Sequence, residues 1–152
     1  MVEKAEVRAG YKTMELVTFH VGEALCGMDI LQVKEINKQL EITPVPQAPT
    51  YVLGVLNLRG KIATVIDLAR KMGLSATDLT KECRNIMVSS ENEDIGLLVD
   101  RIGDALLAER DEIEPPPANI GGVQGRFFEG VFKAKNRLIG ILKLEEVLSN
   151  NE

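Results

Sequence analysis

The chain contains one hairpin pattern twice, and this repeat constrains its fold more than any other feature. Residues 54–68, with the sequence GVLNLRGKIATVIDL, align without a gap to residues 130–144, GVFKAKNRLIGILKL, which lie 76 positions later. Gly60 in the first copy corresponds to Asn136 in the second, and Gly and Asn are the residues that most readily take a left-handed turn conformation. A repeat at so long a spacing predicts a duplicated structural unit.

The first copy of the pattern predicts two short strands, at 55–59 and 62–66. Apolar residues alternate along them, and a two-residue turn at Gly60-Lys61 joins them. Asp67 follows the second strand and is placed to cap a short helix over 68–72.

The segments before the two hairpins also correspond to each other, with a shift of 69 positions. Strands are predicted at 15–21 and 24–30 in the first half, and at 85–88 and 95–99 in the second. The extended pattern of the first half continues through 31–36. A proline-marked loop then precedes the hairpin in each half, and proline excludes a central strand there.

The predicted order of elements is therefore strand, turn, strand, proline loop, hairpin and helical turn, and this order occurs twice. Short strands with frequent turns predict an all-β fold made of two small barrels, each of about five strands. We expect a flexible tail over 1–13 and a single domain over 14–150. The first barrel is expected at about 14–74 and the second at about 82–148, with a groove between them lined by equivalent positions.

Charge and composition restrict the class of partner. The net charge is −5 and only 4% of the residues are aromatic, with no Trp. Nucleic-acid binding needs a basic footprint, and single-strand binding also needs stacking aromatics, so both features count against this class of partner. No apolar run is long enough to span a bilayer and the N-terminus has no signal core, so we expect a cytoplasmic protein without direct membrane insertion. Cys26 and Cys83 are interpreted as buried hydrophobic residues.

The sequence offers little that would support catalysis. His20 is its only histidine, and no metal-binding, nucleophile-elbow or phosphate-loop motif is present. We therefore predict a protein that is not an enzyme and that uses no metal or cofactor. Two alternatives stay open: a small β-barrel that binds nucleic acid, and an enzyme with an undetected site.

Binding to another protein remains as the favoured role. Small barrels with an apolar groove and a few fixed charges suit the docking of a helix or of another barrel. Arg59 and Glu35 each end an extended segment, and we predict an ion pair between them at the rim of the groove. Val33 and Ile102 are related by the repeat and are candidates to line its seam. The alternatives are a solvated surface pair and ordinary core packing.

Three segments of the chain resemble the CheW family of chemotaxis coupling proteins. The most specific is the GVLNLRG…VIDL pattern at 54–68, and the others are CGMDILQVKEI at 26–36 and GLLVD at 96–100. The resemblance covers about residues 15–148. It implies an all-β fold of two intertwined SH3-like five-stranded barrels with short helices.

The resemblance also implies a function. It indicates a non-enzymatic adaptor that couples the cytoplasmic helical tips of chemoreceptors, the methyl-accepting proteins, to the regulatory domain of the histidine kinase CheA. Such a protein would be cytoplasmic and recruited to membrane-associated receptor arrays. The resemblance leaves the kinase-binding surface unassigned. It places seven residues at or near a receptor-binding groove: Val33, Glu35, Gly54, Arg59, Gly96, Ile102 and Ala105.

Overall fold

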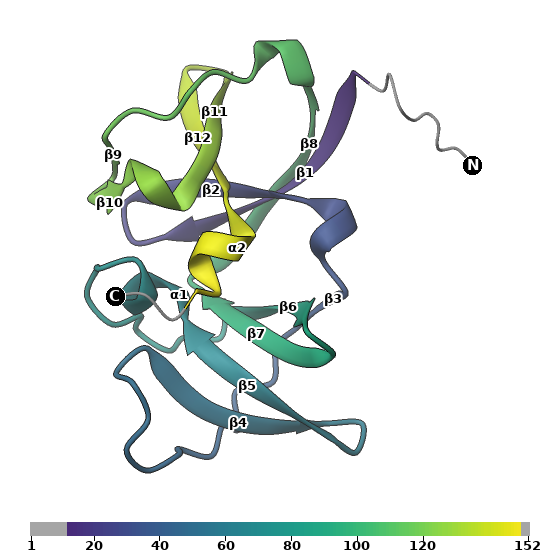
Figure 1. Ribbon diagram of the computed structural model, residues 1–152, viewed down its shortest axis with the longest axis vertical. Coiled ribbons are helices and arrows are strands. Elements are labelled where there is room, and N and C mark those ends of the chain that lie inside the picture. The colour runs from purple at the N-terminus through teal and green to yellow at the C-terminus, as the bar shows by residue number, and fades with distance from the viewer. Residues whose placement is uncertain (1–11, 150–152) are drawn as a thin grey trace.

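The computed structural model describes residues 12–149 and consists mainly of β-strands (Figure 1). The strands are β1 (Thr13–Val21), β2 (Ala24–Asp29), β3 (Glu35–Asn37), β4 (Val52–Leu58), β5 (Lys61–Asp67), β6 (Arg84–Ser90), β7 (Glu93–Val99), β8 (Arg101–Glu109), β9 (Asn119–Ile120), β10 (Val123–Gln124), β11 (Phe128–Ala134) and β12 (Arg137–Leu142). The helices are α1 (Leu68–Lys71) and α2 (Leu144–Val147), with three short 3-10 helices at Ile30–Gln32, Arg110–Glu112 and Gly125–Phe127.

The strands form two five-stranded sheets and one two-stranded sheet. We name the sheet with the order β11-β12-β2-β1-β8 sheet A, and the sheet with the order β4-β5-β7-β6-β3 sheet B. Sheet A lies above sheet B in Figure 1, with α2 between them. Under the internal repeat each strand of one sheet corresponds to the strand at the same place in the other, down to the parallel pairs β12–β2 and β5–β7.

The two sheets do not coincide with the ranges 14–74 and 82–148 expected for the two barrels. Sheet A takes β1 and β2 from the first half of the chain and its other strands from the second half. Sheet B takes β6 and β7 from the second half and its other strands from the first. The halves have thus exchanged their first two strands, so neither sheet is built from one continuous half.

Each sheet is open among the residues described, although its outer strands are partly covered. β8 and β11 are the outer strands of sheet A, and β3 and β4 are those of sheet B. A single bridge from Thr43 to Val55 covers part of β4, and an equivalent bridge from Glu114 to Val131 covers part of β11. These bridges come from the proline-marked loops and shield exposed strand edges.

Three clusters of buried apolar side chains hold the fold together. The largest fills the space between the sheets and draws on both, with Phe19, Ile86 and Leu97 among its fully buried members. A second cluster lies on sheet B around Val65, and a third lies on sheet A around Ile141. Val65 and Ile141 are equivalent under the repeat, so each sheet has its own small core in addition to the shared one.

The predicted hairpin is present, but its turn is one residue earlier than expected. Arg59 and Gly60 both have positive φ, at 52° and 85°, so the turn is Arg59-Gly60 and Lys61 already belongs to β5. The Asn57 side chain accepts a hydrogen bond from the Gly60 amide at 2.8 Å, which stabilises this turn. The second hairpin has the same geometry at Lys135 and Asn136.

Of two other local predictions, one is confirmed and one is wrong in part. The Asp67 side chain caps α1 by accepting from the Ala69 amide, as predicted. The extended run expected over 31–36 is wrong at its start, because a 3-10 helix at Ile30–Gln32 separates β2 from β3. The Asp29 carboxylate accepts from the Leu31 amide at 3.0 Å and so favours this tight turn.

The residues that the structure describes include only part of each predicted chain end. Residues 1–11 of the predicted tail and residue 150 of the predicted domain lie outside it. Thr13, also assigned to the tail, belongs to β1 and pairs with Glu109. Within residues 12–149 there is no helix of the length and hydropathy that crossing a membrane requires.

Candidate protein-interaction site

The predicted pair of Arg59 and Glu35 is present and joins the two outer strands of sheet B. The two terminal guanidinium nitrogens of Arg59 donate to the two carboxylate oxygens of Glu35, which is the bidentate arrangement that suits Arg. Arg59 lies on the turn after β4 and Glu35 begins β3, at opposite edges of the sheet. Since the pair spans these edges, sheet B must curl strongly at this end.

A second ion pair lies beside the first. The Lys34 ammonium donates to the Asp94 carboxylate at 2.7 Å, and this contact fixes the residue before β3 against the start of β7. The hydrogen bond from Lys34 lowers the pKa of Asp94, and the hydrogen bond from Arg59 lowers the pKa of Glu35. The pKa of Arg59 is raised by the same contact. This end of sheet B therefore carries fixed charges that largely compensate one another.

Three of the predicted site residues lie in one row across sheet B. Glu35 pairs with Met87, Met87 with Gly96, Gly96 with Val65, and Val65 with Gly54. The row crosses all five strands of the sheet. Residues distant in sequence are thus neighbours in register, which the linear pattern did not show.

The two glycines in this row are buried and act on the shape of the sheet. Gly54 has a φ of +148°, and a Cβ atom placed there would lie 2.1 Å from the Thr43 carbonyl oxygen. A Cβ atom at Gly96 would lie 3.1 Å from the sulfur of Met87. Because both positions are covered, neither glycine can contact a partner directly. They permit the close approach of strand, loop and side chain instead.

The other predicted residues lie nearer the surface. Val33 and Ile102 are half-buried, and both pack against the core between the sheets. Ile102 and Ala105 belong to β8, where they pair with Phe19 and Val17 of β1. Ala105 is exposed. The structure therefore leaves five of the seven residues accessible to a partner: Val33, Glu35, Arg59, Ile102 and Ala105.

Two strongly exposed apolar residues were not singled out from the sequence. Leu31, in the 3-10 helix before Val33, is 87% exposed, and Leu107 on β8 is 71% exposed. Leu107 lies two residues after Ala105, so both side chains point to the same face of the strand. Exposed leucines next to predicted contact residues are a signal that only burial data reveal.

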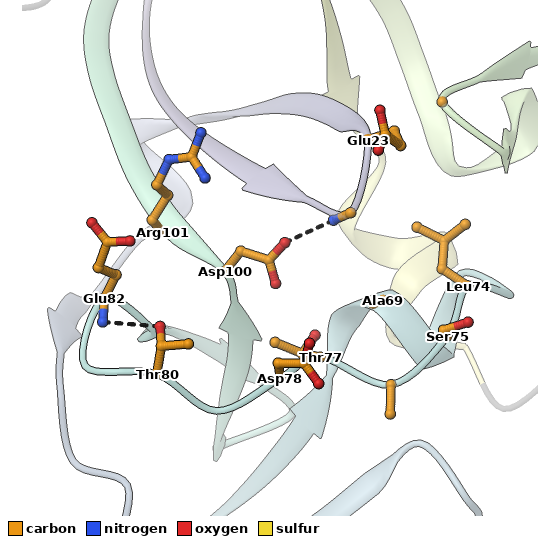
Figure 2. A pocket seen from close by; sticks show the side chains of 13 residues that line it. Glu23, Ala69, Leu74, Ser75, Thr77, Asp78, Thr80, Glu82, Asp100 and Arg101 are labelled. Atoms are coloured by element: carbon orange, nitrogen blue, oxygen red, sulfur yellow. Dashed lines mark hydrogen bonds between the residues drawn. The ribbon is translucent and has the colours of Figure 1, made fainter.

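A hollow of about 440 Å³ lies where the β1–β2 turn faces α1 and the connector after it (Figure 2). Its acidic lining residues are Glu23, Asp78, Glu82 and Asp100, and Arg101 is the cation among them. Figure 2 shows Asp100 directed at the β1–β2 turn, where its carboxylate accepts from the Gly22 amide at 2.9 Å. In the described part of the chain, no three His, Cys, Asp or Glu side chains converge as metal ligands would.

The two cysteines match their interpretation as buried apolar residues. Cys26 and Cys83 are both fully buried and unpaired with each other. Burial raises the pKa of the Cys26 thiol to about 12. A thiol in this state is a poor nucleophile, so Cys26 does not offer the reactive thiolate that a catalytic cysteine needs.

Comparison with known proteins identifies relatives of the chain along nearly its whole length. The sequence model of the CheW-like domain matches residues 15–152. The chemotaxis protein CheW of Rhizobium meliloti is 33% identical over 138 residues, covering 91% of this chain and 89% of that protein. CheW of Bacillus subtilis is 32% identical over 144 residues, with 95% and 90% covered.

A solved structure shows the same architecture. The scaffolding protein TtCheW of Thermoanaerobacter tengcongensis superposes with a TM-score of 0.84 at 33% identity, covering 99% of this chain and 96% of that one. The match extends over both sheets, and it agrees with the sequence relatives in family and in length. The chain therefore belongs to the CheW family.

Proposed function

We propose that this protein is a non-enzymatic adaptor that couples the cytoplasmic tips of chemoreceptors to the regulatory domain of the kinase CheA in chemosensory arrays. The observation that supports this most is the match to scaffolding and chemotaxis proteins of the CheW family along nearly the whole chain. Two intertwined SH3-like barrels, each formed by the curling of one sheet, carry the binding surfaces for both partners. The protein acts in the cytoplasm and joins the receptors at the membrane.

The receptor tip, a helical segment, docks on the surface that includes Val33, Glu35, Arg59, Ile102 and Ala105. The half-buried Val33 and Ile102 offer apolar contact, and the exposed Leu31 extends it. Arg59 and Glu35 supply a fixed, charged rim, because each side chain holds the other in place. A helix laid in such a groove gains its affinity from apolar anchors and its orientation from charges at the rim.

Gly54 and Gly96 support this surface from below. Both lie in the register row that ends at Glu35, so a side chain at either position would displace the strand that carries the rim. These glycines therefore influence receptor binding through the backbone alone. No contact between glycine and receptor is required.

The test uses purified protein, a receptor cytoplasmic fragment and the isolated kinase regulatory domain. Wild type is expected to bind both, whereas Arg59→Glu, which places two carboxylates together, binds the receptor fragment weakly and the kinase domain normally. Arg126→Glu is the control for charge reversal, because Arg126 also forms an ion pair, with Glu146 at 2.6 Å, and is not among the predicted groove residues.

Three results would count against the proposal. A wild-type protein that binds neither partner removes the adaptor role. An Arg59→Glu variant that binds the receptor fragment as the wild type does removes the rim from the receptor surface. Equal losses in Arg59→Glu and Arg126→Glu would mean that the effect is a general response to charge and not a local one.

A further inference from the structure

The positions that form two ion pairs at the end of sheet B have counterparts in sheet A, and these counterparts form no ion pair within residues 12–149. Arg59 corresponds to Lys135 and Glu35 to Asp104 under the repeat. Lys34 corresponds to Gly103 and its partner Asp94 to Leu25. Sheet A therefore has Leu25 in place of the acidic Asp94, and the shorter Asp104 in place of Glu35.

A hollow of about 250 Å³ occupies this end of sheet A, between β8 and the β11–β12 hairpin. We call it the sheet A mouth and define it by its charged lining residues, Arg101, Lys135, Arg137, His20 and Asp104. Within residues 12–149, none of the five side chains forms an ion pair.

The mouth remains open because a smaller residue stands at its base. Thr18 occupies the position that Met87 holds in sheet B, and its hydroxyl donates to the Asp104 carbonyl oxygen at 2.6 Å. Leu25, Leu106 and Ile139 supply apolar walls. The result is an apolar recess with a cationic rim.

The charge of the mouth is opposite to the charge of the whole chain. The chain has 23 acidic and 18 basic residues, whereas the mouth has three permanent cations, one histidine and a single carboxylate. The pKa of His20 is lowered, first by partial burial and then by Arg101 and Arg137, while Asp100 opposes the shift. The imidazole therefore lies near two guanidinium groups whose effect on its pKa Asp100 opposes.

We propose that the sheet A mouth binds an acidic segment of a partner protein, inserting a Glu or Asp carboxylate between Arg101, Lys135 and Arg137 with a neighbouring apolar side chain against Leu25 and Ile139. Charge complementarity selects an acidic partner, and guanidinium groups favour carboxylates through paired hydrogen bonds. The volume accommodates one or two side chains and is smaller than most sites for free small molecules, which take about 300–1,000 Å³.

The mouth does not include the Arg59–Glu35 rim, although Ile102 lines the mouth and also belongs to the proposed receptor surface. The inference does not depend on the adaptor role. It is tested with the protein alone and a synthetic peptide, so it can fail while the proposed function stands, and the reverse also holds.

The single histidine of the chain provides the readout. His20 is the only histidine, so its imidazole signals in an NMR pH titration need no assignment. The probe is a blocked pentapeptide with Glu between two Leu residues, and the matched peptide has Gln in place of Glu. A carboxylate bound beside His20 stabilises the imidazolium, so the Glu peptide is expected to raise the titration midpoint by roughly 0.5–1 pH unit at saturation.

Variants separate the mouth from general charge effects. Arg101→Gln combined with Arg137→Gln is expected to abolish the response to the Glu peptide. Both side chains are exposed, so the fold should persist, which circular dichroism would check. Arg110→Gln, in the 3-10 helix that follows β8, is the control and should respond as the wild type does. Added salt should weaken the response.

The proposal is overturned if the Glu and Gln peptides shift the midpoint equally, or if neither shifts it. It is also overturned if the double variant responds as the wild type does. The proposal is supported if the Glu peptide shifts the midpoint and the Gln peptide does not. This response should be lost in the double variant and retained in Arg110→Gln.

Discussion

The guanidinium of Arg59 donates hydrogen bonds to the carboxylate of Glu35 from both of its terminal nitrogens, and this contact connects the β4–β5 turn to β3. Arg59 reaches Glu35 because its backbone is left-handed, with a φ of 52°, which is unusual for a residue other than glycine. The turn sequence and the ion pair therefore support one structural feature, the curl at the end of sheet B.

We expect Arg59→Gln to raise the pKa of Glu35. Hydrogen bonding to the guanidinium favours the ionised carboxylate and holds the pKa of Glu35 below its ordinary value of 4.5. The contact is thus present at neutral pH and is lost as the pH falls through this lowered pKa. Carbon-detected NMR titration of Glu35 in wild type and variant measures the change, and an unaltered midpoint would show that the pair is not formed in solution.

Glycine substitutions should separate backbone strain from close approach. Gly54→Ala combines positive φ with a Cβ atom only 2.1 Å from a carbonyl oxygen, so we expect a loss of about 3 kcal/mol in the free energy of unfolding. Gly60→Ala is the control, because its φ is +85° but no atom lies within 4 Å of the added Cβ. It should lose about 1 kcal/mol. Urea unfolding of both variants gives the comparison, and equal losses would contradict the close approach at Gly54.

The buried carboxylate of Asp67 should hold the connector after α1 in place. It accepts from the Ala69 amide at 3.2 Å, the Thr77 amide at 2.9 Å and the Thr77 hydroxyl at 2.7 Å. We expect Asp67→Ala to cost about 2–3 kcal/mol of stability, since it leaves the buried Ala69 amide and the partly buried Thr77 donors unpaired. Hydrogen exchange at the Thr77 amide should accelerate more than at the core of β7. Uniform acceleration would mean that the carboxylate supports the whole fold and not this connector.

How much of this arrangement could be read from the sequence depends on the distance over which each interaction acts. The hairpins, the capping by Asp67 and the burial of Cys26 follow from local patterns, and the structure confirms them. The exchange of β1 and β2 between halves was not predicted. The repeat shows that β2 and β7 are equivalent, but it does not show which of them pairs with β5, because that depends on packing across the whole chain.

The candidate site shows the same division. The approach of Arg59 to Glu35 was predicted from two residues at the ends of extended segments, and the contact is present. The register row linking Glu35, Gly96 and Gly54 was hidden, since it depends on the pairing of five strands. The sheet A mouth was also missed. It becomes visible only when equivalent positions are compared after both sheets are known.

Thiol reactivity gives a simple test of the packing around Cys26 and Cys83. Both side chains have no exposed surface, and the pKa of Cys26 is raised to about 12 by burial. We therefore expect neither thiol to react with a disulfide reagent at pH 8 until the protein unfolds. In guanidinium chloride two thiols per chain should react at once. Rapid reaction of one thiol in the native protein would contradict the burial of that residue.

The exchange of strands predicts that neither half of the chain folds alone. In a fragment of residues 1–79, β1 lacks its neighbour β8 and β2 lacks its neighbour β12, so the strands of sheet A have only each other. A two-stranded hairpin is marginal in water, and the core between the sheets would be exposed. Chain division between Leu79 and Thr80 cuts an exposed connector and keeps Thr77 with Asp67. Each fragment should lack a cooperative thermal transition, whereas an equimolar mixture should recover one. A fragment of residues 1–79 that unfolds cooperatively without its partner would show that the first half is an independent barrel, contrary to the exchanged topology.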